Sequence, residues 1–146
     1  MSTSTAAPSR TSAANESWSL LTRLFLRQRP WFMAVCAEFD LTPGQLQALK
    51  ALDPAEPVPM RNLAEALACD NSNVTGIVDR LEERGLVERR TAPHDRRVKM
   101  LVVTPGGADL RAAIVRRMQE APEPLRRLSA DEQRRLCELV RKALDD

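Results

Sequence analysis

Residues 70–86 read DNSNVTGIVDRLEERGL, and this stretch decides how the rest of the chain is interpreted. Its apolar residues recur at the i, i+3, i+4 and i+7 spacing of an amphipathic helix, and they are Val74, Ile77, Val78 and Leu81. Asp70 or Asn71 is expected to cap the first turn, and Gly85 stands where a left-handed residue ends a helix. The stretch therefore predicts a helix that packs one face on a core and has a capping residue at its start and a left-handed glycine after its end.

The opposite face of this helix carries small polar side chains where a solvated face usually carries long charged ones. Its residues are Ser72, Gly76, Asp79 and Glu83, flanked by Asn73, Thr75 and Arg80. Ser, Asn, Thr and Gly cost helix propensity of up to about 1 kcal/mol each, so another reason for them is needed. One reason is a nucleic-acid surface, because short side chains let a helix enter a major groove about 12 Å wide. The alternative is a capped helix with a merely polar end.

Composition sets the broad class of the protein. The chain has 146 residues, of which 43% are hydrophobic, and its net charge of +2 does not indicate a class of binding partner. Basic residues nevertheless gather between 89 and 99. Cys36, Cys69 and Cys137 show neither a disulfide framework nor metal-ligand spacing, so we expect a cytoplasmic protein without metal or cofactor. No apolar run approaches the roughly 20 residues of a membrane span, and residues 1–14 are expected to form a disordered tail.

Helical signals precede the central stretch. Asn15 is expected to cap a helical region over 15–40 that contains all five aromatic residues and bends at Pro30. Thr42 and Gln45 then predict a capping box, with a proline at the first helical position. After this helix, Val58 is expected to lie either in a short strand or in a loop. Met60 to Ala68 predicts a further short helix, which a tight turn separates from the central one, and this arrangement is a helix-turn-helix.

A basic hairpin is expected after Gly85. LVERRTA and VKMLVVT have the alternation of strands, and PHDRR between them supplies turn residues, so the tip is predicted at 93–97. Such a tip is either a wing whose arginine enters the minor groove, or a solvated loop in which Asp95 pairs with a neighbouring arginine.

Two helices are expected at the C-terminal end. Thr104 caps the first, and Ser129 with Glu132 forms a capping box for the second. Their apolar stripes are Leu110, Ile114, Val115 and Met118, and then Leu136, Leu139, Val140 and Leu144. The stripes of the outer helices exceed what the central lobe can cover, which indicates a partner.

The order of these elements, together with LTPGQLQALKAL, VDRLEERGLVERR, DRR and VKMLVVTPGG, resembles the MarR family of bacterial winged-helix transcriptional regulators over residues 41–107. The resemblance implies a mainly α fold with a minor β part: a winged helix-turn-helix lobe over 41–104 and dimerisation helices over 15–40 and 105–146. It also implies a homodimer without enzymatic activity, which binds a pseudopalindromic operator in double-stranded DNA and acts as a repressor released by a ligand.

Site residues follow from the same resemblance, which places a recognition helix over 71–84 in the major groove and a wing over 92–98 in the minor groove. The major-groove positions are Ser72, Asn73, Thr75 and Gly76, the phosphate positions are Asn71, Arg80 and Arg61, and the wing positions are Arg96 and Arg97, oriented by Asp95. Many relatives carry an arginine where this chain has Gly76, so their operators do not transfer to it.

Family members often bind small aromatic or lipophilic molecules between the dimer helices and the winged lobe. The candidate pocket residues here are Trp18, Phe25, Trp31 and Phe32, although helix-spaced aromatics also suit a core. Alternatives from other classes are a protein-interaction module without DNA binding and a regulator that senses oxidants through Cys36. An enzyme is disfavoured because the chain has one histidine, His94, and no glycine-rich phosphate loop.

Overall fold

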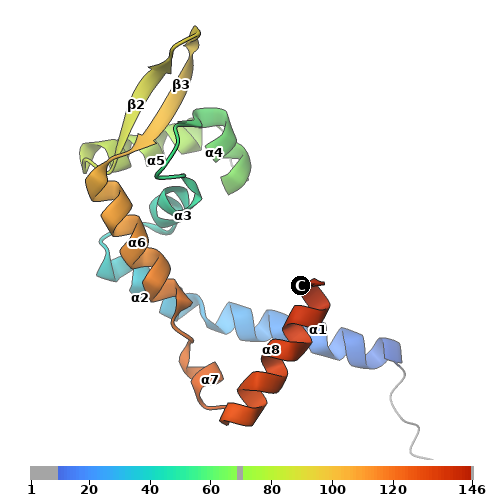
Figure 1. Cartoon of the computed structure of the whole chain (residues 1–146). Helices are drawn as coiled ribbons and strands as arrows, with labels where there is room; N and C mark the ends of the chain where they lie inside the picture. Colours follow the sequence, from blue (N-terminus) through green and yellow to red (C-terminus); the bar gives the residue numbers. More distant parts are fainter. Residues whose placement is uncertain (1–9, 69–70, 146) are drawn as a thin grey trace, which may run out of the picture.

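The structure is a computed structural model that describes residues 10–68 and 71–145, with side chains for 12–68 and 73–145. Its elements, in chain order, are α1 (Arg10–Arg27), α2 (Arg29–Glu38), α3 (Pro43–Ala51), β1 (Val58–Pro59), α4 (Met60–Leu67), α5 (Asn71–Glu83), β2 (Val87–Ala92), β3 (Asp95–Val103), α6 (Pro105–Gln119), α7 (Glu123–Arg126) and α8 (Ala130–Leu144). Figure 1 shows α3 to α5 and the β2–β3 hairpin at one end of the molecule, and α1 and α8 at the other. The helices α2 and α6 connect the two ends.

The fold is mainly helical with one small antiparallel sheet, which confirms the expected fold class. The sheet has the strand order β1-β3-β2, and Val58 of β1 pairs with Leu101 of β3. The β2–β3 pairing shifts register between Thr91 and Ala92, so the hairpin is bulged near its tip. None of the helices within the described ranges has the length and apolarity needed to cross a lipid bilayer.

The core lies beneath the predicted face of α5. Val74, Val78 and Leu81 are fully buried there, and Ile77 is half-buried against the same cluster. Ile77 lies beside Gly44 of α3, where a Cβ atom would be 3.1 Å from its Cδ1 atom. The helices α3 and α5 therefore pack closely, which fixes α5 with its polar face outward.

Local capping signals place four helix ends as predicted. The Thr42 hydroxyl accepts from the Gln45 backbone N–H at 3.3 Å, and the Gln45 side chain accepts from the Thr42 N–H at 3.1 Å. Ser129 forms the same box at the start of α8, and Thr104 caps α6. Gly85 has the left-handed φ of 69° that was expected after α5.

Three expectations need correction. The first helix begins at Arg10 rather than Asn15, because Ala13 and Ala14 are good helix formers, so 10–14 belong to α1 and not to a tail. A third, short helix, α7, follows the N-cap Pro122, because Pro124 lies in its first turn, where no helix hydrogen bond needs the missing N–H. The hairpin turn is 93–94 alone, and β3 already begins at Asp95.

The other boundaries agree more closely. The helical region breaks at Gln28, so that Pro30 lies in the first turn of α2, as the bend required. The predicted strand at Val58 is present as β1. Cys69 and the proposed cap Asp70 lie outside the described residues.

Candidate nucleic-acid interface

The outer face of α5 is polar and exposed. Asn73, Thr75, Gly76 and Arg80 are all exposed, and a Cβ atom at Gly76 would meet nothing within 4 Å. Asn71 and Ser72 form the first turn of the same helix, and their side chains lie outside the described part of the chain. A face of this kind suits contact with a polar surface at short range and offers no apolar patch to a protein partner among its described side chains, which disfavours the protein-interaction alternative.

A hollow of about 370 Å³ brings three predicted site residues together from three elements. Arg61 of α4, Thr75 of α5 and Arg97 of β3 all line it. Lys99 of β3 lines it too, and the sequence analysis counted that residue only as part of a basic segment. Strand alternation is the signal that finds Lys99, because residues two apart lie on the same face as Arg97. The hollow therefore presents three cationic side chains beside the polar face of α5.

The wing arginines are exposed on a bulged strand. Arg96 and Arg97 follow Asp95, whose Oδ1 atom accepts the backbone N–H of Arg97 at 2.9 Å. Within the described part of the chain, Asp95 forms no ion pair. The structure therefore does not support the alternative of a solvated loop in which Asp95 pairs with a neighbouring arginine. Asp95 shapes the backbone that carries Arg97.

Arg89 of β2 has a structural role that the sequence analysis missed. Its guanidinium donates to the Glu82 carboxylate at 3.0 Å, to the Thr75 carbonyl at 3.3 Å, and to the Asp79 carboxylate. Its backbone N–H also donates to Glu82 at 3.0 Å. The Arg89 side chain is only 24% exposed, so this member of the basic segment braces the wing against α5 instead of facing solvent.

Arg80, a predicted phosphate contact, forms an ion pair with Glu83 one turn along α5. The two groups are 3.3 Å apart and both side chains are about two-thirds exposed. Exposed pairs of this kind contribute between 0 and about 1 kcal/mol, so the pair does not hold Arg80 away from another anion.

Apolar side chains are exposed on the outer helices. Trp18 is 73% and Phe25 78% exposed on α1, and Leu139 and Leu144 are similarly exposed on α8. The helix α8 carries its stripe along the face that the sequence predicted, and the described residues leave that stripe uncovered. The helices α1 and α8, which carry these side chains, lie well away from α5 (Figure 1).

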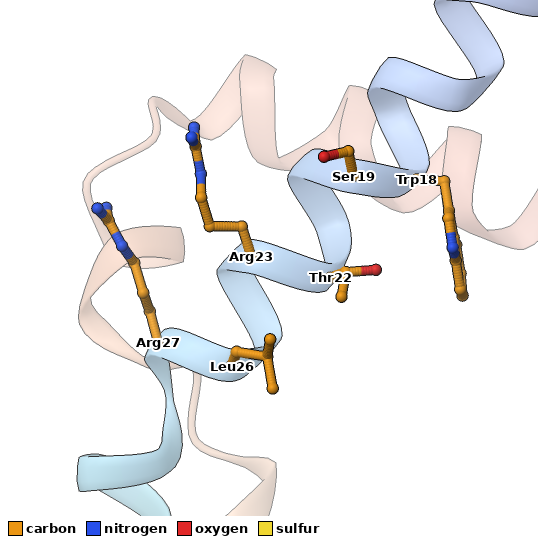
Figure 2. Close-up of a pocket in the computed structure, with 6 residues that line it drawn as sticks. All are labelled: Trp18, Ser19, Thr22, Arg23, Leu26 and Arg27. Atoms are coloured by element: carbon orange, nitrogen blue, oxygen red, sulfur yellow. The ribbon is translucent and has the colours of Figure 1, made fainter.

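The predicted pocket residues separate into two groups. Trp18 and Phe25 line an open hollow of about 600 Å³ between α1 and α7, whose other lining residues are Leu21, Thr22, Leu24, Gln28, Pro122 and Leu125. Trp31 and Phe32 instead pack against the core, and the Arg117 guanidinium lies 5.8 Å from the Trp31 ring centroid. Figure 2 shows a neighbouring hollow, where Arg23 and Arg27 extend from one side of α1 and Trp18 and Leu26 from another.

Cys36 is poorly suited to oxidant sensing. It is 2% exposed in the core, and burial raises the pKa of its thiol. A reactive cysteine needs access and a lowered pKa, because the thiolate is the nucleophile. Cys36 therefore acts as a small apolar core residue.

Comparisons with known proteins agree with this geometry. The model of the MarR family matches residues 41–99. The transcriptional repressor NicR of Pseudomonas putida is 32% identical over 127 residues, which cover 86% of this chain and 80% of NicR. The transcriptional regulator HosA of Escherichia coli O111:H- is 31% identical over 107 residues, which cover 73% of this chain and 79% of HosA.

Solved structures share the whole architecture. The crystal structure of apo MarR from Escherichia coli has a TM-score of 0.77 at 26% identity, covering 86% of this chain and 94% of MarR. The structure of Bordetella bronchiseptica BpsR, whose DNA binding is regulated by 6-hydroxynicotinic acid, has a TM-score of 0.63 at 27% identity, covering 88% of this chain and 92% of BpsR. With its winged lobe, its exposed α5 and these relatives, the chain belongs to the MarR family of DNA-binding transcriptional regulators.

Proposed function

We propose that this regulator is a homodimeric repressor that binds a pseudopalindromic operator and is released from it by a small molecule. The observation that carries the DNA-binding surface is the convergence of Arg61, Thr75 and Arg97 beside the exposed face of α5. These residues come from three elements, so their meeting on one surface reflects the fold and not a single charged segment. Repression is supported by the relative NicR, which is itself a repressor.

In this proposal α5 lies in the major groove. The residues assigned to the floor of the groove and the base edges are Ser72, Asn73, Thr75 and Gly76. The open space at Gly76 allows the DNA to approach the helix backbone closely. Asn71, Arg80 and Arg61 contact phosphates on either side of the groove and set the register of the helix.

The wing enters the adjacent minor groove in the same proposal. Arg96 and Arg97 approach the groove, where a narrow width concentrates negative potential, and the Asp95 carboxylate holds the backbone at Arg97. Lys99 lines the same hollow as Arg97 and adds a phosphate contact at the base of the wing. Arg89 of β2 binds Glu82 of α5 and so keeps the wing at a fixed angle to α5.

Dimerisation covers the exposed apolar side chains of the outer helices. Apolar side chains as exposed as Leu20 and Leu26 of α1 are rarely left in water, and α8 offers a second apolar stripe to the other copy. A two-fold dimer places its two lobes on half-sites about 10 base pairs apart, centre to centre.

A small aromatic acid is the proposed ligand class. The hollow at Trp18 and Phe25 is apolar, with Gln28 and Thr22 as polar lining groups, which suits a flat ring with one polar edge. The relative BpsR is regulated by 6-hydroxynicotinic acid, so this compound is the first to test. Its binding is measured by quenching of tryptophan fluorescence and by release of operator DNA. An absence of both effects at millimolar concentration contradicts this ligand class.

DNA binding is tested by fluorescence anisotropy with the duplex upstream of the protein's own coding sequence, at several salt concentrations. Replacing Arg96 and Arg97 with alanine should weaken binding and flatten the salt slope by about one unit for each phosphate that the protein no longer neutralises. Arg127→Ala is the matched control, because Arg127 is exposed on the outer helices and pairs with its neighbour Glu123. Unchanged affinity and slope in the double variant contradict the wing assignment.

A further inference from the structure

Two helix ends face each other across Arg84: the last turn of α2 and the last turn of α5. The chain leaves α5 through the left-handed Gly85, whose carbonyl accepts the Thr104 hydroxyl at 2.6 Å. It leaves α2 through Asp40, which also has a positive φ, of 52°. Both ends therefore reverse tightly, and each exposes carbonyl groups that the helix cannot satisfy itself.

The end of α2 closes with paired backbone hydrogen bonds. The Asp40 N–H donates to the Ala37 carbonyl at 3.1 Å, and the Leu41 N–H donates to the Cys36 carbonyl at 3.0 Å. Aspartate is one of the few non-glycine residues that adopt a left-handed backbone as single residues, and these two hydrogen bonds close the turn at Asp40. The carbonyls of Phe39 and Asp40 remain at the negative end of the helix.

Arg84 satisfies these two carbonyls from the far side of the junction. Its Nη1 atom donates to the Asp40 carbonyl at 2.5 Å, and its Nη2 atom donates to the Phe39 carbonyl at 3.2 Å. Arg84 is the residue directly after α5, so its backbone moves with the recognition helix. A guanidinium suits this place because its planar fork reaches two acceptors at once and its charge faces a helix C-terminus.

Other contacts hold the same turn of α2 to α6. Arg117 of α6 binds both carboxylate oxygens of Glu38, at 3.0 and 3.1 Å, and lies over Trp31. The body of α2 otherwise packs on α3 and α6, and α5 packs on α3, α4 and β2. The fork of Arg84 thus joins the end of the recognition helix directly to the end of α2.

We infer that Arg84 is a positioning residue for operator binding: it fixes the recognition helix to the C-terminal turn of α2, so that the orientation of α1 and α2 is passed to α5. The inference rests on the proposed function, in which α1 contributes to the dimer and the ligand hollow. A change at α1 and α2 then reaches the DNA-reading surface through one side chain, in addition to the packed core. Arg84 itself touches no DNA in this account.

The first measurement is amide hydrogen exchange in the free protein, which requires neither DNA nor a known oligomeric state. In Arg84→Ala, the amides of Asp40 and Leu41 should exchange about tenfold faster, because the charged hydrogen bonds that support this turn are removed. Arg84→Lys should be intermediate, since an ammonium keeps the charge but lacks the fork. Arg90→Ala, which removes an exposed arginine paired with its near neighbour Glu88, is the control and should match the wild type.

The second measurement compares affinity for an operator selected on the wild type with affinity for unrelated DNA. Arg84→Ala should bind the operator about tenfold more weakly and unrelated DNA within about twofold, because misplaced base contacts reduce only specific binding. Arg84→Lys should recover part of the operator affinity. Equal losses of affinity for both DNAs in Arg84→Ala would indicate that Arg84 contacts a phosphate. An unchanged exchange rate of the Asp40 amide would show that Arg84 does not support the end of α2. Either result overturns the inference.

These outcomes are separable from a failure of the proposed function. A wild-type chain without any preference for a selected operator contradicts the repressor proposal. The exchange measurement still decides for or against the bridge between Arg84 and α2 in that case.

Discussion

Arg89 and Glu82 form an ion pair across the junction of the wing and the recognition helix, with 3.0 Å between Nη1 of the arginine and Oε1 of the glutamate. The same guanidinium also reaches Asp79 and the Thr75 carbonyl. Because all three acceptors belong to α5, the strand cannot rotate relative to the helix without breaking several bonds. The pairing holds the wing and α5 together as one unit.

Arg89→Ala should therefore loosen the wing more than it unfolds the protein. We expect the free energy of unfolding to fall by about 1–2 kcal/mol, a value kept small because the partners are partly exposed. Urea denaturation measures this decrease, and anisotropy should show weaker operator binding. Arg90→Ala, with its local pair to Glu88, should stay within about 0.5 kcal/mol. Equal effects of the two substitutions would contradict the brace.

Gly107→Ala should be strongly destabilising. A Cβ atom at Gly107 would lie 2.0 Å from the Leu86 carbonyl oxygen, and that carbonyl also accepts the Thr104 N–H at 3.1 Å. Backbone atoms cannot move aside as a flexible side chain can, so the cost is about 1–3 kcal/mol or more. At Gly106, one residue earlier, the nearest atom would be 3.9 Å away. Thermal unfolding of Gly106→Ala should thus resemble the wild type, and a similar destabilisation there would show that the close approach is not the cause.

The same substitution should have opposite effects at Gly76, within α5, and at Gly85, two residues after its end. Gly76→Ala places a methyl group in open space within a helix and should stabilise the free protein by up to about 1 kcal/mol. Gly85→Ala forces a φ of 69° on alanine and should destabilise it by about 1 kcal/mol or more. Denaturation midpoints measure both changes. Shifts of the same sign would contradict the assigned backbone conformations.

The contact between α2 and α6 should weaken in acid. The hydrogen bond from Arg117 lowers the pKa of the Glu38 carboxyl, aided by the arginine charge and opposed by partial desolvation. A lowered pKa in the folded state means that the stabilisation is fully present above the ordinary glutamate value of about 4.3 and is lost as pH falls through the folded value. The stability difference between wild type and Glu38→Gln should consequently shrink when urea denaturation is repeated from pH 7 to pH 3. A difference that stays constant over this range would show that the charge of Glu38 contributes nothing.

Helix ends were predictable because capping needs only residues within one turn. Thr42 with Gln45, and Ser129 with Glu132, form the expected boxes. The start of α1 was not predictable in this way, since no cap marks Arg10 and the alanines that follow simply continue the helix. Asn15 has the side chain of a cap but lies within α1, which shows that a capping residue alone does not locate a helix start.

The sequence could name residues of the proposed DNA-binding surface but could not show how they are arranged. Arg61, Thr75 and Arg97 were expected from the family resemblance, and the structure places them around one hollow. The roles of Arg84 and Arg89 depend on carbonyls and carboxylates that are distant in the chain, so no local pattern reveals them. Long-range pairing distinguishes an arginine that braces the lobe from one that is left exposed on its surface.

The central claim is that two copies of the chain present two α5 helices and two wings to one duplex. Hydroxyl-radical footprinting of the wild type on its selected operator, with the number of chains per duplex measured on the same complex, tests it most directly. We expect two chains per duplex and two protected half-sites centred about 10 base pairs apart, with protection at the wing positions reduced in the Arg96→Ala, Arg97→Ala variant. One chain per duplex, or a single protected half-site, would contradict it.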